Sequence, residues 1–201
     1  MSNTFARPLV ISPHFDDAVF SCGATLAAHP GTVVYTVFSG CPASDVTTDW
    51  DRHCGFDNAA QAMQARSLED DRALDVLNAV PDRGDFLDAQ YVPSAPRVHA
   101  PTQQAIARAL DRALRRHAAH TLVIPFGLYH SDHKLVHLAC ADVWRANPEL
   151  ACFAYEDALY RRLAGQLQTR MADFSRAALS RHRPFRTGEP LLPIGLRNAT
   201  Q

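Results

Sequence analysis

The chain has 201 residues, of which 47% are hydrophobic and 20% charged, and its formal net charge is −1. This length suits one domain with a substantial core, and the composition is ordinary for a soluble globular protein. A net charge near zero provides no bulk electrostatic attraction to nucleic acid or to an anionic membrane, so neither is expected as a partner on this ground.

The cysteines and the first residues of the chain indicate a compartment. The five cysteines are odd in number, widely spaced and without a C-x-x-C pair, which is typical of a reducing environment and not of a disulfide framework. Residues 1–7 lack the apolar core of a signal peptide, and no run approaches the roughly 18–20 apolar residues of a membrane helix. We therefore expect a cytoplasmic protein that contacts no membrane.

The first forty residues predict a strand, a helix and a second strand. Residues 8–13 are a short, apolar, β-branched run that predicts a buried strand, and 17–29 carries apolar residues at helical spacing. Residues 32–38 are β-branched almost throughout and predict the clearest strand. Such a unit, over roughly thirty residues, is a βαβ motif and predicts a parallel sheet.

The same alternation continues to the end of the chain. The expected elements are an irregular loop at 39–58, a helix at 59–80, a weaker strand at 85–89, helices at 102–117, 133–145 and 163–179, and strands at 121–125 and 152–155. This order predicts one doubly wound α/β domain over residues 1–180, with a mostly parallel sheet flanked by helices. Residues 181–201 are expected to form a tail that packs on this domain or extends from it.

Two of the predicted strands end in turns that carry histidine and aspartate. The sequence HFDD (14–17) follows the first strand, and HSDH (130–133) follows the strand at 121–125. In open parallel sheets, sites form beyond the carboxyl ends of the strands. Residues three apart across the first turn of a helix point to one side, so His14 can converge with Asp17, and His130 with His133.

These residue types suit a catalytic metal. Three ligands of the His/His/Asp type and one water make a zinc site with an open position, where the pKa of the bound water falls to about 7. Three of the four converging residues would bind the metal, and the fourth would be a catalytic histidine. A free carboxylate beside the water, such as Asp16, can accept its proton.

Each part of this site also has a simpler interpretation. Asp16 and Asp17 can cap the helix that follows them and offset its dipole, and the histidines of 130–133 can be solvated loop residues. His133 and His137, four positions apart, are an alternative metal pair, although His137 continues an apolar helix face. The joint occurrence of both turns, each directly after a buried strand, favours the metal site.

The two turns, together with the Val-Phe-Ser-Gly end of the second strand, resemble the PIG-L/LmbE zinc-dependent de-N-acetylases over roughly 8–160. The resemblance implies a Rossmann-like α/β fold, a Zn²⁺ cofactor (or another divalent metal such as Fe²⁺) and hydrolysis of acetamides, typically on N-acetylglucosamine-type sugars. Phe15 stands where the family usually has proline, and Ala18 where it has glutamate. The loop at 40–57 matches no particular subfamily, so the resemblance is weakest for the substrate.

The resemblance also implies roles for particular residues. The metal would be held by residues of both turns, namely His14, Asp17 and His133. Asp16 would be the general base, and His130 the general acid or oxyanion stabiliser, with Asp132 orienting His130 from outside the set of metal ligands. Arg66 in the long helix and Asp88 at the end of the third strand would contact the substrate.

From the residues and the resemblance together, we expect a metal-dependent amidase. It would remove an N-acetyl or similar N-acyl group from a small-molecule amino sugar, a glycoconjugate or a related metabolite. One alternative is a two-metal phosphoester hydrolase, since paired aspartates often bridge metals. The other is a non-catalytic sugar- or nucleotide-binding α/β module, although no G-x-G-x-x-G follows a strand. A homo-oligomer is compatible with each of these interpretations.

Overall fold

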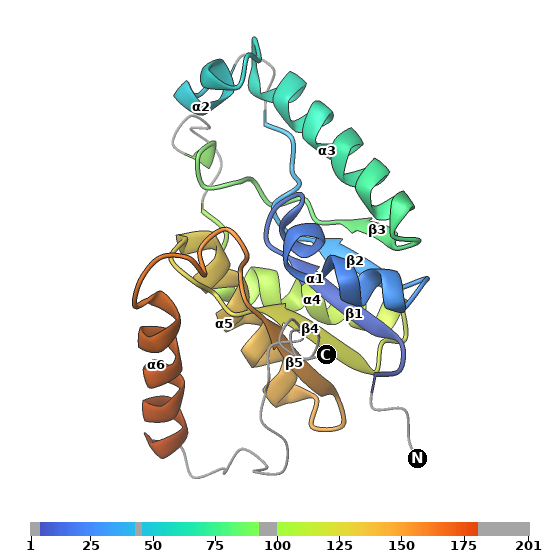
Figure 1. Cartoon of the computed structure of the whole chain (residues 1–201), viewed down its shortest axis with the longest axis vertical. Helices are drawn as coiled ribbons and strands as arrows, with labels where there is room; N and C mark the ends of the chain where they lie inside the picture. Colours follow the sequence, from blue (N-terminus) through green and yellow to red (C-terminus); the bar gives the residue numbers. More distant parts are fainter. Residues whose placement is uncertain (1–4, 43–45, 93–99, 181–201) are drawn as a thin grey trace, which may run out of the picture.

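The centre of the molecule is a parallel β-sheet with helices on both faces (Figure 1). The computed structural model describes residues 5–42, 46–92 and 100–180. Within them the sheet has five strands in the order β3-β2-β1-β4-β5, and every neighbouring pair is parallel. The strands are β1 (Pro8–Ser12), β2 (Val33–Thr36), β3 (Val80–Arg83), β4 (Thr121–Pro125) and β5 (Ala151–Tyr155). The predicted α/β fold is confirmed.

Six helices accompany the sheet within the described residues. They are α1 (Asp17–Ala28), α2 (Asp49–His53), α3 (Ala59–Val76), α4 (Gln103–Arg116), α5 (Ser131–Ala146) and α6 (Gln166–Ser180). In the described part of the chain, no helix has both the length and the hydropathy that crossing a bilayer requires. The tail predicted at 181–201 lies outside the described residues.

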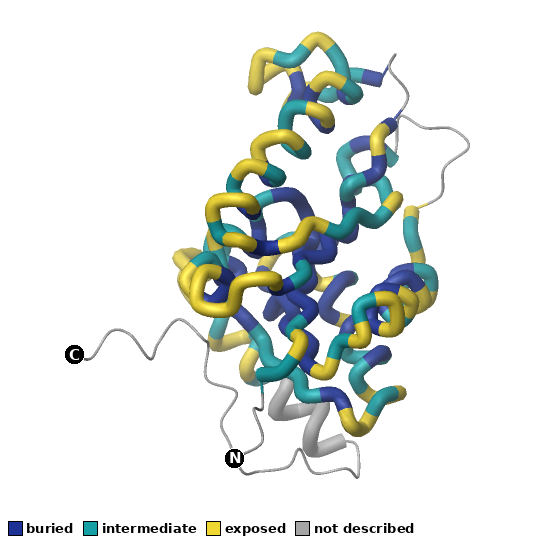
Figure 2. The backbone as a smooth tube through the Cα atoms, turned by 90° about the vertical axis from the view of Figure 1, so that its right-hand side faces the viewer, coloured by how far each residue is buried: buried dark blue, intermediate teal, exposed yellow. Residues whose placement is uncertain are grey.

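Apolar side chains of the strands alternate between two faces, and two helices cover each face. Val10 and Val34 belong to a core cluster that also contains buried residues of α1 and α3. Leu9 and Ile11 belong to a second cluster with α4 and α5. Successive strand residues point to opposite faces, so β1 is buried on both sides, which explains its unbroken apolar sequence. In Figure 2 the most buried segments gather at the centre, and the exposed ones lie on the outer surfaces.

The third strand, β3, spans Val80–Arg83, so the prediction of a strand at 85–89 was wrong. β3 is an edge strand that pairs with β2 in parallel, with Pro81 opposite Val34. Proline is tolerated in an edge strand because one side of such a strand needs no ladder hydrogen bonds. The strand contains proline and charged residues, so its sequence lacks the apolar pattern of a strand. The run that follows it is more apolar, and the prediction was placed there for that reason.

The long helix α3 ends at Val76, four residues before its predicted end at 80. Leu77 is its C-cap, and Asn78 has a φ of 52°, a left-handed conformation in which a helix cannot continue. This turn redirects the chain into β3. In Figure 1, the start of α3 extends beyond the sheet to α2, which lies within the segment that we expected to be an irregular loop.

The short helix α2 is fixed by a capping box and a buried carboxylate. The Thr48 side chain accepts a hydrogen bond from the Asp51 amide, and the Asp51 side chain accepts one from the Thr48 amide. Asp51 has no exposed surface, and it also accepts a hydrogen bond of 2.7 Å from the Tyr91 hydroxyl. Helix α2 is therefore anchored to the chain that follows β3.

Candidate metal centre

The sheet order places the two histidine-bearing turns side by side. β1 and β4 are neighbours and run in parallel, so the turns that follow them meet at the same edge of the sheet. His14, Asp17 and His133 are all buried there, and their ligand atoms lie within 4.8 Å of one another. This convergence agrees with the expectation from the sequence.

The Asp17 carboxylate lies at the centre of this group. Its Oδ2 atom is 3.3 Å from Nδ1 of His14 and 3.1 Å from Nε2 of His133. Burial opposes ionisation of Asp17, but its hydrogen bonds with the two histidines outweigh burial and lower its pKa. Two imidazoles and one ionised carboxylate in a buried cluster are donors that suit a divalent metal, so these residues fit the implied cofactor.

A buried aspartate that the sequence analysis did not select supports His133. Oδ1 of Asp157 lies 2.5 Å from Nδ1 of His133, and Oδ2 of Asp157 accepts a hydrogen bond of 2.8 Å from the Leu128 amide. Burial alone would lower the pKa of His133, but its hydrogen bonds with Asp157 and Asp17 raise it. Asp157 follows β5, the neighbour of β4, so its place at the same edge was the signal that could have found it.

His14 has a carboxylate at each of its ring nitrogens. Its Nε2 atom is 3.0 Å from Oδ2 of Asp132, which also accepts a hydrogen bond from the Ala89 amide. Burial opposes protonation of His14, but hydrogen bonds to Asp132 and Asp17 raise its pKa to about 9. Among the described residues, His14, His130 and Asp132 form a second group whose ligand atoms lie within 4.8 Å.

His130 is the N-cap of α5 and stands beside the buried group. Its Nδ1 atom accepts a hydrogen bond of 3.3 Å from the Asp132 amide, so in the neutral ring the proton is assigned to Nε2. Burial, with the nearby charge of His14, lowers the pKa of His130. The Tyr160 ring stacks on His130 at 6.2 Å and lies edge-on to His133 at 5.1 Å. Tyr160 was not selected from the sequence.

Asp16 occupies the N-cap position of α1 in a left-handed backbone conformation, with a φ of 70°. Within the described residues the Asp16 side chain makes no capping hydrogen bond, and the Asp17 side chain accepts a hydrogen bond from the amide of His14, which precedes the helix. The capping interpretation of Asp16 is therefore wrong. Burial raises the pKa of Asp16 to about 6, and the negative charges of Asp70 and Glu69 add to this shift.

The two residues expected to contact substrate lie close to this group and to each other. Nη1 of Arg66 is 3.7 Å from Oδ2 of Asp88, and that oxygen is 3.8 Å from Nε2 of His14. Asp88 lies beyond β3 and not at its end. The Arg66 guanidinium also lies over the Phe15 ring, at 5.7 Å from its centre. Phe15, the bulky residue at the position where the family usually has proline, thus lines the candidate site beside Arg66.

His137 does not take part in either group of potential ligands among the described residues. Its Nδ1 atom lies 2.9 Å from the carbonyl oxygen of Pro125, and burial lowers its pKa to about 4. A buried, neutral histidine that is hydrogen-bonded to a strand end is part of the core. The alternative pair of His133 and His137 is therefore not supported.

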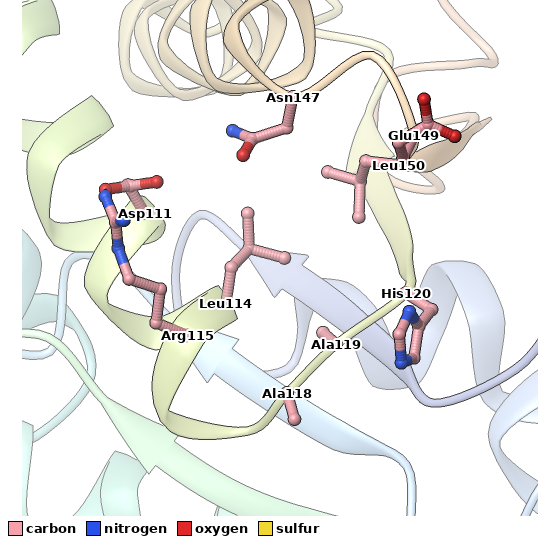
Figure 3. Close-up of a pocket in the computed structure, with 9 residues that line it drawn as sticks. All are labelled: Asp111, Leu114, Arg115, Ala118, Ala119, His120, Asn147, Glu149 and Leu150. Atoms are coloured by element: carbon pink, nitrogen blue, oxygen red, sulfur yellow. The ribbon is translucent and has the colours of Figure 1, made fainter.

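A separate hollow lies at the opposite end of the sheet, where β4 and β5 begin (Figure 3). Its walls include Leu114, Leu150 and His120, together with the ion pair between Asp111 and Arg115. The hollow is open, and two of its charged side chains, Asp111 and Arg115, are already paired with each other. The candidate chemistry lies at the other edge of the sheet.

Residues 9–144 match the family described as PIG-L: GlcNAc-PI de-N-acetylase. The match covers more than half of the chain, so the protein belongs to this family, and the resemblance seen in the two turns is confirmed. De-N-acetylases hydrolyse amides, and the protein is an enzyme of this amidase and deacetylase class.

Solved structures of antibiotic deacetylases have the same fold. A triple mutant of the teicoplanin-pathway deacetylase (Orf2*T) is 28% identical, with a TM-score of 0.69 over 80% of this chain and 68% of that one. The A40926 pseudoaglycone deacetylase Dbv21 is 28% identical, with a TM-score of 0.65 over 78% and 65%. The zinc-inhibited form of teicoplanin deacetylase Orf2 is 25% identical, with a TM-score of 0.70 over 80% and 71%. No curated protein matches the sequence.

Proposed function

We propose that the protein is a zinc-dependent hydrolase that removes an N-acetyl group from an amino sugar or a glycoconjugate. The observation that carries the proposal is the buried group of His14, Asp17 and His133, with His130 beside it and Asp16 next to Asp17 in the chain. Membership of the GlcNAc-PI de-N-acetylase family supports the sugar-type substrate, and similarity to the teicoplanin-pathway and A40926 pseudoaglycone deacetylases supports the removal of an N-acyl group.

His14, Asp17 and His133 would hold the metal. When bound, a divalent ion would polarise the acetamide carbonyl and lower the pKa of its water ligand. Two histidines and one carboxylate suit Zn²⁺ in an open catalytic site, and Fe²⁺ uses the same ligand types. One similar deacetylase is described in a zinc-inhibited form, so metal analysis of the purified protein is the measurement that identifies the native metal.

The residues beside the metal would handle protons and charge. Asp16 would accept a proton from the attacking water as the new C–O bond forms at the acyl carbon. His130 would donate a hydrogen bond from Nε2 to the oxyanion, because its Nδ1 atom already accepts one from the chain. The proton held by Asp16 would pass to the amine nitrogen as the C–N bond breaks, which releases acetate and the free amine.

Arg66 and Asp88 would orient the substrate. One provides several N–H donors and the other provides acceptor oxygens, which together match the hydroxyl groups of a sugar. Their separation of 3.7 Å is longer than a hydrogen bond, and a hydroxyl group beside them would contact both side chains at once. Both residues lie at the end of the site that faces α3 and the chain after β3.

The proposal is tested by metal analysis combined with an amine-release screen over N-acetylated sugars, glycoconjugates and small amino metabolites. We expect one metal ion per chain in the wild-type protein, amine release from a sugar acetamide, and loss of both in His14→Ala. The proposal fails if the purified protein carries no metal and His14→Ala leaves amine release unchanged.

A second candidate function follows from the second group of ligand-type residues. His14, His130 and Asp132 share one histidine with the first group, and each nitrogen of that ring faces a different group. If each group held a metal, the pair of ions would supply the chemistry of a phosphoester hydrolase. A stoichiometry near two metals per chain, together with phosphatase activity, would favour this candidate.

A further inference from the structure

We propose that Asp70, a buried carboxylate of α3, is a positioning residue that aims Asp16 at the reacting water, and that Arg83 of β3 holds Asp70 in place. The inference deepens the proposed function and rests on it, because it assigns a task to Asp70 through Asp16.

The backbone of Asp16 has a conformation that needs support. Its φ of 70° and ψ of −17° are left-handed, and a residue other than glycine rarely adopts them without a reason. This conformation sets the direction in which the side chain leaves the start of α1. A neighbour that holds the Asp16 backbone therefore also determines where its carboxylate points.

Asp70 provides this support directly. The Asp16 amide donates a hydrogen bond of 2.9 Å to Oδ1 of Asp70. The Asp70 side chain is only 2% exposed, so water does not compete for this bond. The two residues are 54 positions apart, and the bond therefore connects the β1–α1 turn to the middle of α3.

Arg83 holds the other oxygen of Asp70. One of its terminal nitrogens lies 2.7 Å from Oδ2 of Asp70, and the other donates a hydrogen bond of 2.8 Å to Oγ1 of Thr36 at the end of β2. The guanidinium carbon lies 5.1 Å from the centre of the Phe15 ring. Arg83 thus contacts both Asp70, the acceptor of the Asp16 amide, and Phe15, the residue that precedes Asp16.

The adjacent residue Asp71 provides a matched control. Its carboxylate is 2.5 Å from the same nitrogen of Arg83, but its side chain is 46% exposed, and in the described part of the chain it makes no hydrogen bond with Asp16. Asp70→Ala and Asp71→Ala each remove one carboxylate from Arg83. Only the first also removes the acceptor of the Asp16 amide.

Steady-state kinetics on the metal-loaded enzyme test the effect on turnover. We expect Asp70→Ala to lower kcat about 10- to 100-fold, with KM and metal content within about twofold of wild type, since a small misplacement of a catalytic group has effects of this size. Asp71→Ala should change kcat less than about twofold. Equal losses in the two variants would show a role in the ion pair alone and would overturn the inference.

A double variant tests whether Asp70 acts through Asp16. In an Asp16→Asn enzyme, adding Asp70→Ala should lower kcat no further, because effects that run through one residue do not add. A second loss of similar size would show that Asp70 supports the site by another route, and would overturn the inference. An inactive wild-type enzyme would overturn the proposed function and this inference together, whereas a fully active Asp70→Ala would overturn this inference alone.

The amide proton of Asp16 gives a readout independent of activity. An N–H group that donates to a buried carboxylate resonates downfield, so this proton should move upfield in ¹⁵N-labelled Asp70→Ala and stay in place in Asp71→Ala. Thermal melting identifies folded variants, and Asp70→Leu, which has a similar size and no acceptor atom, replaces Asp70→Ala if alanine prevents folding. An Asp16 amide that is unchanged in the folded Asp70 variant would refute the proposed contact.

Discussion

His133 and Asp157 form the most deeply buried polar pair of the site, with Nδ1 of the histidine 2.5 Å from Oδ1 of the aspartate and both side chains 1% exposed. The contact fixes the ring so that Nε2 faces Asp17 at 3.1 Å. Histidines that bind metals commonly donate their second N–H group to a carboxylate, which orients the ring and makes it a better ligand. The chain after β5 therefore prepares a ligand that follows β4.

Removing the charge of Asp157 should weaken metal binding. We expect Asp157→Asn to lower the metal affinity about 10- to 100-fold, because loss of such a partner has effects of this size. Competition with a chromophoric chelator measures the affinity. The half-buried neighbour Glu156 is the control, and Glu156→Gln should bind the metal like wild type. Equal affinities of all three proteins would contradict the role of Asp157.

Asp16 should be required for turnover and not for metal binding. We expect Asp16→Ala to lower kcat about 10²- to 10⁴-fold, the usual contribution of a general base, with an unchanged metal content. Metal analysis by mass spectrometry and amine-release kinetics check both quantities on one preparation. Asp49→Ala is the control, because that side chain on α2 is 98% exposed. Loss of metal from Asp16→Ala would mean that Asp16 is a ligand.

His137 should make the protein less stable in mild acid. Burial lowers its pKa to about 4, whereas the unfolded chain has a value near 6.5. Between these values the unfolded state binds more protons, so the free energy of unfolding decreases as the pH falls, by about 3 kcal/mol in total and by about 2 kcal/mol at pH 5.

Urea unfolding of wild type and His137→Gln at pH 7 and pH 5 measures this contribution. Glutamine can still donate a hydrogen bond to Pro125 but does not titrate. The loss of stability between the two pH values should therefore be about 2 kcal/mol smaller in the variant. An equal loss in both proteins would show that His137 is not the group responsible.

The hydroxyl of Tyr91 should stabilise the chain around α2. Tyr91→Phe removes the donor to Asp51, which is fully buried, and an unsatisfied buried acceptor costs about 1–3 kcal/mol. Urea unfolding at pH 7 measures the loss. Tyr129→Phe is the control, because Tyr129 is 56% exposed and its variant should unfold within about 0.5 kcal/mol of wild type. A similar value for both variants would refute the assignment.

Local sequence predicted the elements on which the site is built. β1 and β4 are apolar β-branched runs buried on both faces, and the sequence analysis required them to be neighbours for the two turns to meet, which the sheet order shows. The convergence of His14 with Asp17 and His133 could therefore be predicted. The error in β3 has a local cause, since Pro81 and two charged residues mask an edge strand whose pairing depends on β2.

Most of the supporting residues could not be predicted in the same way. The place of Asp157 just after β5 was a usable signal, but Tyr160 and the pair of Asp70 and Arg83 reach the site through tertiary contacts between elements that are distant in sequence. Their side chains have no distinctive local spacing. A buried aspartate on a helix has the same sequence pattern as an exposed one, and only the packing of α3 against the β1–α1 turn distinguishes them.

The ligand-type residues of the two turns are far apart in the chain, with 118 positions between His14 and Asp132. A metal held by both turns would close a chain loop of roughly that length, like a reversible crosslink between the two halves of the fold. High affinity would then appear only after β4 has docked on β1. The rate of metal uptake during refolding would report when the two halves assemble.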